Sequence, residues 1–187
     1  MLIVLSACQS APPVPVATPA PTAAAAAVPK PTTAPVAPTT VSSAPPATGA
    51  SRGDLLNAAD AAYASGKSED AAGLYERVIN TPPAADEPPP ASAAMTDYAH
   101  FRAMVALLAA GREDDARAHM EALRSREASA PLPRLAEQFW NQYSMTASVK
   151  AACAQLQPEI ASQAGPVLST LQSLGVGADP ARLCSVA

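Results

Sequence analysis

A proline-rich tract near the amino terminus limits what this chain can fold into. Of the 21 prolines in the 187 residues, 11 lie between Ser10 and Gly49. Proline fixes φ and lacks a backbone N–H donor, and the intervening alanines offer little apolar area to bury. We therefore expect residues 9–50 to be a disordered Pro/Ala-rich linker of extended, polyproline II character. The folded part should be residues 51–187.

The chain beyond residue 50 has a different composition. It contains all seven aromatic residues, and Lys30 is the only charged residue before Arg52. About 135 residues is enough for one domain with its own core. Residues 51–187 carry 11 basic and 16 acidic side chains, and the basic ones form no cluster, so we expect no nucleic-acid partner. No apolar run approaches the ~20 residues that span a bilayer, so membrane association would require an anchor.

The first residues suggest such an anchor. The segment Leu5-Ser6-Ala7-Cys8 resembles the lipobox of bacterial lipoproteins, and the flexible tract follows it directly. The resemblance implies that Cys8 is lipidated and that residues 1–8 are the end of a signal peptide. No Lys or Arg precedes the apolar run, so we interpret Met1 as an internal start. The alternative is a buried or chance cysteine.

The same resemblance predicts a location and a use for the linker. In lipoproteins of Gram-negative bacteria an Asp after the lipidated cysteine favours the inner membrane, and Gln9 stands there instead. This implies lipid anchoring at the periplasmic face of the outer membrane. Residues 9–50 would then be a tether across the periplasm, or a linker whose length hardly matters.

If Cys8 carries lipid, an even pair of cysteines remains. Cys153 and Cys184 would share an oxidising compartment, which favours a disulfide. Closing a loop of about 32 residues contributes roughly 3–4 kcal/mol in the chain-entropy model. The alternative is two free, half-buried thiols.

Helical patterns begin after Ser51. We expect Asp54 to be the N-cap of a helix that starts at Leu55 and ends at Gly66. Ser68 should cap a second helix, which the prolines at 82 and 83 stop.

This helix–turn–helix resembles a tetratricopeptide repeat. The small and apolar residues that match the family's spacing are Leu55, Ala58, Ala59, Gly66, Ala71, Tyr75 and Pro83. The resemblance implies that Ala59 and Ala71 let the two helices approach closely and that Tyr75 fills the groove between them. One departure is Ala62, where the family has a Tyr, because Tyr63 is displaced by one position.

A second copy of the pattern follows. Residues 97–111 and 112–127 form the next predicted pair, and the distance from Gly66 to Gly111 is 45 residues, against about 34 in the family. A Pro-rich insertion at 82–94 accounts for the excess. The equivalent positions are Met104, Leu107, Gly111, Ala116, Met120 and Leu123. Residues 51–130 are thus predicted to form two tetratricopeptide-like hairpins.

Residues 131–187 should cap this array with further helices. An apolar stripe at four-residue spacing predicts a helix from Arg134 to about Leu156, and Pro158 starts another that Pro166 kinks or splits. A last helical turn would bring Cys184 back toward Cys153. Nothing in the chain has the pattern of a strand, so the predicted fold class is all-α.

Motifs of catalysis are not found. The chain has no glycine-rich phosphate loop, no G-x-S-x-G elbow and no metal-ligand spacing of Cys and His. His100 and His119 lie on separate predicted helices without a third ligand nearby in sequence. The acidic run at 113–115 opens a helix, where carboxylates favour the positive end of the dipole. We predict no enzyme activity, no cofactor and no metal site.

The leading hypothesis is a non-catalytic binding module. In tetratricopeptide repeats the first helix of each pair lines a concave groove. The resemblance therefore implies that the partner-binding residues are Tyr63, Tyr98, Phe101 and Leu108. The alternative for each is packing against the next helix. The predicted partner is an envelope protein or peptide, with the chain acting as an assembly factor for a secretin, pilus or outer-membrane complex. A regulator of peptidoglycan synthesis and a structural, self-associating lipoprotein are the alternatives.

Overall fold

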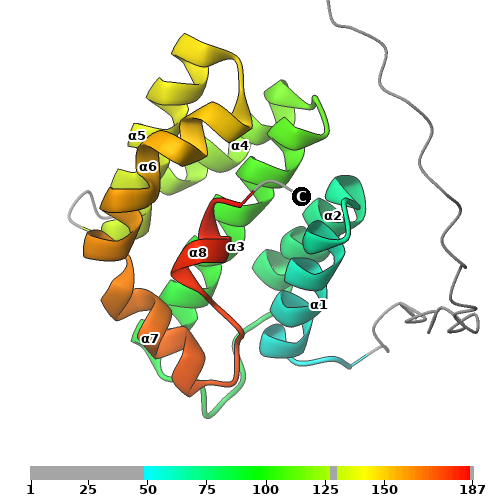
Figure 1. Cartoon of the computed structure of the whole chain (residues 1–187). Helices are drawn as coiled ribbons and strands as arrows, with labels where there is room; N and C mark the ends of the chain where they lie inside the picture. Colours follow the sequence, from blue (N-terminus) through cyan, green and yellow to red (C-terminus); the bar gives the residue numbers. More distant parts are fainter. Residues whose placement is uncertain (1–48, 127–129, 186–187) are drawn as a thin grey trace, which may run out of the picture. The chain divides into compact units, whose positions relative to one another are not determined.

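The computed structural model describes residues 49–126 and 130–185, and these residues form helices and no strand (Figure 1). Their bounds are α1 (Arg52–Ala64), α2 (Ser68–Asn80), α3 (Pro89–Ala109), α4 (Glu113–Arg124), α5 (Pro131–Thr146), α6 (Val149–Gln163), α7 (Gly165–Ser173) and α8 (Pro180–Leu183). The all-α fold class is confirmed. Cys8, the signal-peptide segment 1–8 and residues 9–48 of the expected linker lie outside the described residues.

The first helix begins earlier than the sequence suggested. Its N-cap is Ser51, whose side chain accepts a hydrogen bond from the Asp54 backbone N at 3.1 Å. The Asp54 carboxylate accepts one in return from the Ser51 backbone N at 3.2 Å. The prediction of Asp54 as N-cap was wrong because Asp54 is the third helical residue of a capping box. Ser68, expected to cap α2, is instead its first helical residue.

The two helix pairs of the array are α1/α2 and α3/α4. Gly66 and Gly111 follow the first helix of each pair with φ of +76° and +77°, the left-handed conformation that glycine adopts without strain. Helix α3 starts at Pro89, so residues 89–94 belong to a helix and not to the expected loop. Proline suits this place because the first N–H of a helix has no intrahelical partner.

Small side chains set how closely the first three helices pack. Helix α2 contacts both α1 and α3. Ala59 on α1 and Ala71 on α2 are fully buried, as is the Tyr75 ring. The spacing of small and large residues quoted from the sequence therefore coincides with packing positions.

The carboxyl-terminal half is divided differently from the prediction. Ala147 takes the left-handed conformation, φ 49°, and Ser148 caps a new helix, so the expected continuous helix from Arg134 to Leu156 is two helices, α5 and α6. Pro158 lies inside α6 and does not start it. Pro166 stands in the first turn of α7, where it marks the predicted split.

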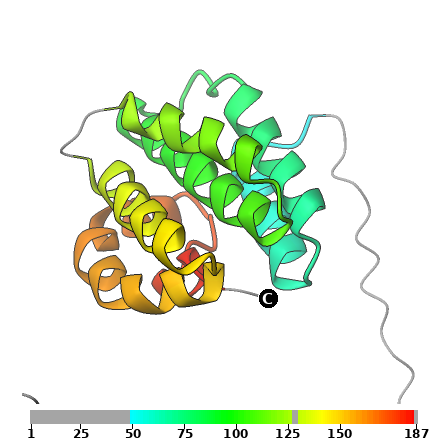
Figure 2. The ribbon, with the colours of Figure 1, turned by 90° about the horizontal axis from the view of Figure 1, so that it is seen from above.

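Helix α3 is the centre of the fold. It packs between the α1/α2 pair on one side and α5 to α7 on the other, with α4 alongside (Figures 1 and 2). The short α8 lies across α3 between α1 and α6 (Figure 1). Among the described helices, none is both long enough and apolar enough to span a membrane.

Candidate functional site

The four predicted partner-binding residues lie in the core. Tyr63, Tyr98, Phe101 and Leu108 are between 0 % and 5 % exposed. The Phe101 ring packs edge-on against Phe139 of α5, with the ring centroids 6.0 Å apart. None of the four side chains faces an open groove, and their part in binding a partner stays a prediction. The alternative, packing against neighbouring elements, describes their positions.

The carboxyl-terminal segment reaches into this region. We call residues 175–185 the C-terminal cover, and the side of α1 and α3 that carries Asn57, Tyr63, Tyr98 and Arg102 the inner face. The cover is held by apolar burial, because Val176, Ala178 and Leu183 are at most 2 % exposed. The inner face is therefore occupied by the chain's own last segment.

The Asn57 side chain on α1 binds main-chain groups at the start of the cover. The Asn57 side-chain amide donates to the Gly175 carbonyl oxygen at 3.0 Å. Its oxygen accepts from the Gly177 backbone N at 2.8 Å. This two-point contact binds the main chain on both sides of Val176, at the left-handed turn of Gly175 (φ +78°), and involves no side chain of the cover.

Arg102 on α3 holds the other end in a similar way. Its Nη1 donates to the carbonyl oxygens of Arg182 and Leu183, at 2.6 and 3.0 Å. These carbonyls lie at the end of α8, where helical carbonyls lack intrahelical donors. Arg102 thus supplies a donor to the carbonyl of the buried Leu183, while the Arg182 carbonyl also accepts from the Ser185 backbone N at 3.3 Å.

A polar network fixes the Arg102 guanidinium. Its Nε donates to the Asp60 carboxylate at 3.2 Å and to the Tyr75 hydroxyl at 3.1 Å. Tyr98 and Tyr75 both donate to the same carboxylate, the former at 2.8 Å. The guanidinium carbon lies 4.5 Å from the centroid of the Tyr63 ring, within reach of a cation–π contact.

The charges of this network are complementary. Burial alone would lower the pKa of Arg102, but the facing Tyr75, Tyr98 and Asp60 groups raise it, so the guanidinium stays charged. Burial raises the pKa of Tyr75 and Tyr98, with the Asp60 carboxylate acting in the same direction, so both phenols remain protonated donors. Removing one member of such a buried pair leaves the other charge without compensation.

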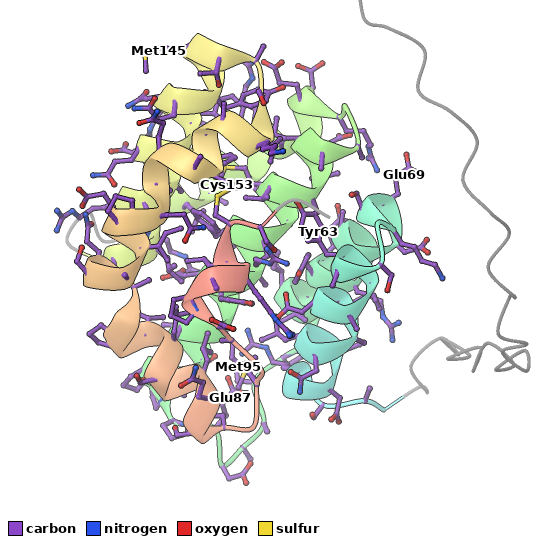
Figure 3. The ribbon with its side chains drawn as sticks, viewed as in Figure 1. Tyr63, Glu69, Glu87, Met95, Met145 and Cys153 are labelled. Atoms are coloured by element: carbon purple, nitrogen blue, oxygen red, sulfur yellow. A yellow bond between two sulfur atoms is a disulfide. The ribbon has the colours of Figure 1, made fainter. Side chains whose placement is uncertain are left out.

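A disulfide fixes the end of the cover. Cys153 on α6 and Cys184 after α8 are joined, with their Cα atoms 5.2 Å apart (Figure 3). This is the pairing that the sequence predicted. The cover is therefore attached to the domain at both ends, by α7 before it and by this bond after it.

The two histidines form a pair between α3 and α4. The Nδ1 atoms of His100 and His119 are 3.0 Å apart, so one neutral ring donates to the other. Burial, His119 and Arg126 lower the pKa of His100 to about 4. Burial also lowers the pKa of His119, against the opposite effects of Glu76 and Asp115. At neutral pH both rings are uncharged, which suits a structural hydrogen bond.

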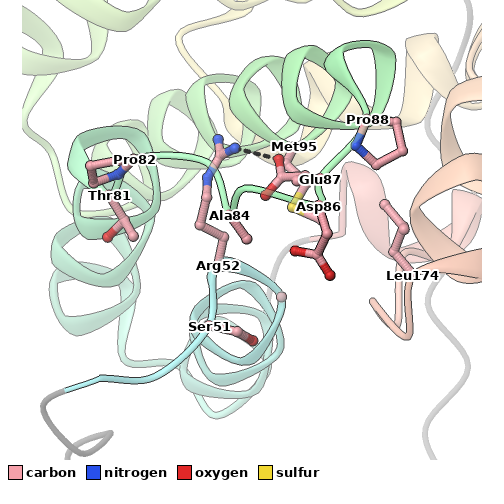
Figure 4. A pocket seen from close by; sticks show the side chains of 11 residues that line it. Ser51, Arg52, Thr81, Pro82, Ala84, Asp86, Glu87, Pro88, Met95 and Leu174 are labelled. Atoms are coloured by element: carbon pink, nitrogen blue, oxygen red, sulfur yellow. Dashed lines mark hydrogen bonds and ion pairs between the residues drawn. The ribbon is translucent and has the colours of Figure 1, made fainter.

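A pocket of about 320 Å³ opens at the start of α1 (Figure 4). Met95 and Leu174 form apolar parts of its wall, and Arg52 forms an ion pair of 2.7 Å with Glu87. Arg52 also donates to the hydroxyls of Ser92 and Thr96, so its donors are occupied. The pocket has one further carboxylate, Asp86, and offers space for a small apolar group.

Metal-ligating side chains do not gather in the described part of the chain. Within residues 49–126 and 130–185, no three His, Cys, Asp or Glu side chains are placed to hold a metal ion. No family model, curated protein or solved structure matches this chain. The inner face, with its main-chain-binding Asn57 and Arg102, is therefore the candidate site on geometry alone.

Sequence reasoning did not single out Asn57 or Arg102. Arg102 had a signal, because it is the one charged residue in the apolar run from Phe101 to Leu108. A charge at such a position requires a buried partner, and Asp60 similarly stands among alanines on α1. Asn57 had no signal, because an exposed Asn on a helix is ordinary.

Proposed function

We propose that this chain is an envelope lipoprotein, anchored through Cys8 at the periplasmic face of the outer membrane. Its helical domain binds an envelope protein or a peptide and catalyses no reaction. The role that fits is an assembly factor for a secretin, pilus or outer-membrane complex. The Cys153–Cys184 disulfide supports an oxidising compartment, where such bonds persist.

One observation carries the binding proposal. Asn57 and Arg102 bind main-chain groups at two places on the inner face, the turn after α7 and the end of α8. Main-chain contacts of this kind give affinity with little dependence on sequence, and apolar positions between them add selectivity. An inner face that holds its own chain in this way has the chemistry to hold a partner's chain.

Photo-crosslinking in intact cells tests this proposal. A benzoylphenylalanine is placed at position 61, an exposed Ala on α1 one turn beyond Asn57, and at position 141, an exposed Asn on α5, as the matched control. We expect a defined heterologous protein to be crosslinked from position 61 and not from position 141. Equal crosslinking from both positions, or none from position 61, would overturn the proposal. Loss of palmitate labelling in Cys8→Ser tests the anchor separately.

A further inference from the structure

The pocket at the start of α1 adjoins the inner face. It lies between the start of α1, the 81–88 segment and the end of α7 (Figure 4). Leu174 on its wall directly precedes Gly175, whose carbonyl accepts from Asn57. Gly53, which also lines it, lies one helical turn before Asn57 on the same side of α1. No residue of the C-terminal cover lines the pocket, so it is an open site beside a face that the chain itself fills.

Apolar side chains cover one part of the pocket wall. Met95 of α3 is 5 % exposed, and Leu174, at the end of α7, is 38 % exposed. The other apolar residues of the wall are Pro82, Ala84 and Pro88. An aliphatic chain that lies against Leu174 would remove apolar surface of both from water, which favours binding.

The net charge of the pocket is that of one carboxylate. Arg52 and Glu87 form an ion pair of 2.7 Å and neutralise each other, and further Arg52 donors are directed at a carbonyl and two hydroxyl oxygens. Asp86 is exposed and makes no ion pair with another described residue. The Asp54 carboxylate accepts from the Ser51 backbone N and offsets the positive end of the α1 dipole. The pocket therefore favours a cation.

We propose that this pocket binds a basic side chain of the partner protein, with the aliphatic stem against Leu174 and Met95 and the charged end at Asp86. This rests on the proposed function, because it specifies a residue type that the partner presents beside the inner face. Lysine and arginine have the required structure, a charged group at the end of an apolar stem of methylene groups. The ligand class is a protein segment with an exposed lysine or arginine.

Two other classes of ligand fit the pocket less well. An anion would meet the Asp86 and Glu87 carboxylates, while the Arg52 donors are directed at other groups. An uncharged apolar side chain would shield the Asp86 carboxylate from water without compensation, which costs free energy. A basic side chain buries the same apolar surface and compensates for that carboxylate.

A nuclear magnetic resonance titration of the purified full chain tests this. The probe is lysine capped as Nα-acetyl-lysine N-methylamide, and the readout is the shift of the backbone amides of Gly53, Asp86 and Leu174. A ligand of this size should bind with a dissociation constant on the order of millimolar. Capped norleucine, which keeps the stem and lacks the ammonium group, should bind about threefold more weakly. Equal binding of norleucine, tighter binding of capped glutamate, or no shift at these amides with tens of millimolar lysine probe would overturn the proposal.

Matched variants locate the two ends of the bound side chain. Asp86→Asn should weaken binding of capped lysine about threefold, whereas Asp114→Asn, at an exposed position on α4, should leave it unchanged. Leu174→Ala should weaken it about twofold, whereas Met145→Ala, at an exposed position on α5, should not. All four positions are exposed, and circular dichroism checks that each variant is folded. Equal effects within either pair would contradict the proposal.

The outcomes for the pocket and for the proposed function are distinguishable. Capped lysine bound at the pocket, without crosslinks from position 61 in cells, would sink the proposed function alone. Crosslinks from position 61 without binding of capped lysine at the pocket would sink this inference alone.

Discussion

Removing the Cys153–Cys184 disulfide should destabilise the domain by an amount that the chain entropy sets. The two cysteines are 31 residues apart in sequence. Cross-linking a loop of that length restricts the unfolded chain, and the loop-entropy relation gives about 3.7 kcal/mol at 25 °C. Domains of this size have free energies of unfolding of roughly 5–15 kcal/mol, so Cys153→Ala/Cys184→Ala should still fold.

Urea unfolding monitored by circular dichroism measures this difference. With a slope of about 2 kcal/mol/M, the midpoint of the double variant should lie about 2 M below that of the oxidised wild type. Reductant should lower the wild-type midpoint by a similar amount and leave the double variant unchanged. A loss of less than about 1 kcal/mol, or a reductant effect on the double variant, would refute the loop-entropy reasoning.

Four further substitutions probe other parts of the fold. The pKa of the His100 imidazole is about 4 in the folded state and near 6.5 in the unfolded chain. The neutral His100 therefore contributes its full stability above pH 6.5, and this contribution is lost as the pH falls toward 4. Between pH 7 and 4, the free energy of unfolding measured in urea should therefore fall less for His100→Gln than for wild type. Equal losses would mean that protonation of His100 does not affect the stability of the fold. Tyr98→Phe removes a buried hydrogen bond to a carboxylate and should cost about 1.5–3 kcal/mol. Tyr63→Phe should be neutral or stabilising, because the Tyr63 hydroxyl is buried without a partner among the described residues; thermal melts that rank the two variants the other way would contradict the network. Ala147→Gly should raise the melting temperature by the equivalent of about 0.5–1 kcal/mol, since φ is 49° there, and a lowered value would argue against the left-handed turn.

Residues that begin or end helices made part of the fold predictable from the sequence. Gly66 and Gly111 end α1 and α3 as expected, because a left-handed residue after a helix is best supplied by glycine. Small residues at the predicted spacing are buried between helices, and Pro166 marks the start of a helix. These features depend on neighbours in sequence, so the sequence alone indicates them.

The errors arose where tertiary packing overrides local pattern. The break at Ala147 has neither glycine nor proline, and the apolar spacing continues through it, so nothing local announces two helices. Pro158 is tolerated inside α6 because it and Ala154, whose carbonyl loses its donor, are exposed residues that water can reach. Helix propensity predicts neither the break at Ala147 nor a proline inside α6.

The candidate site was predictable only in its location. Tyr63 and Tyr98 do lie on α1 and α3 but are buried, beside Arg102, which binds the returning end of the chain. Phe101 is buried on another side, against Phe139 of α5. A return of this kind depends on contacts between residues about 80 apart, such as Arg102 and Arg182, which no local pattern encodes. Arg102 in its apolar run and Asp60 among alanines were the signs in the sequence that this region holds buried polar groups.

Amide hydrogen exchange of the C-terminal cover tests the central claim most directly. In oxidised wild type, the Gly177 amide, which donates to Asn57, should exchange slowly, and Asn57→Ala should release it while Asn141→Ala does not. That result would establish that the inner face holds its own chain. If residues 175–185 of the oxidised wild type exchange as fast as a free peptide, the account is contradicted.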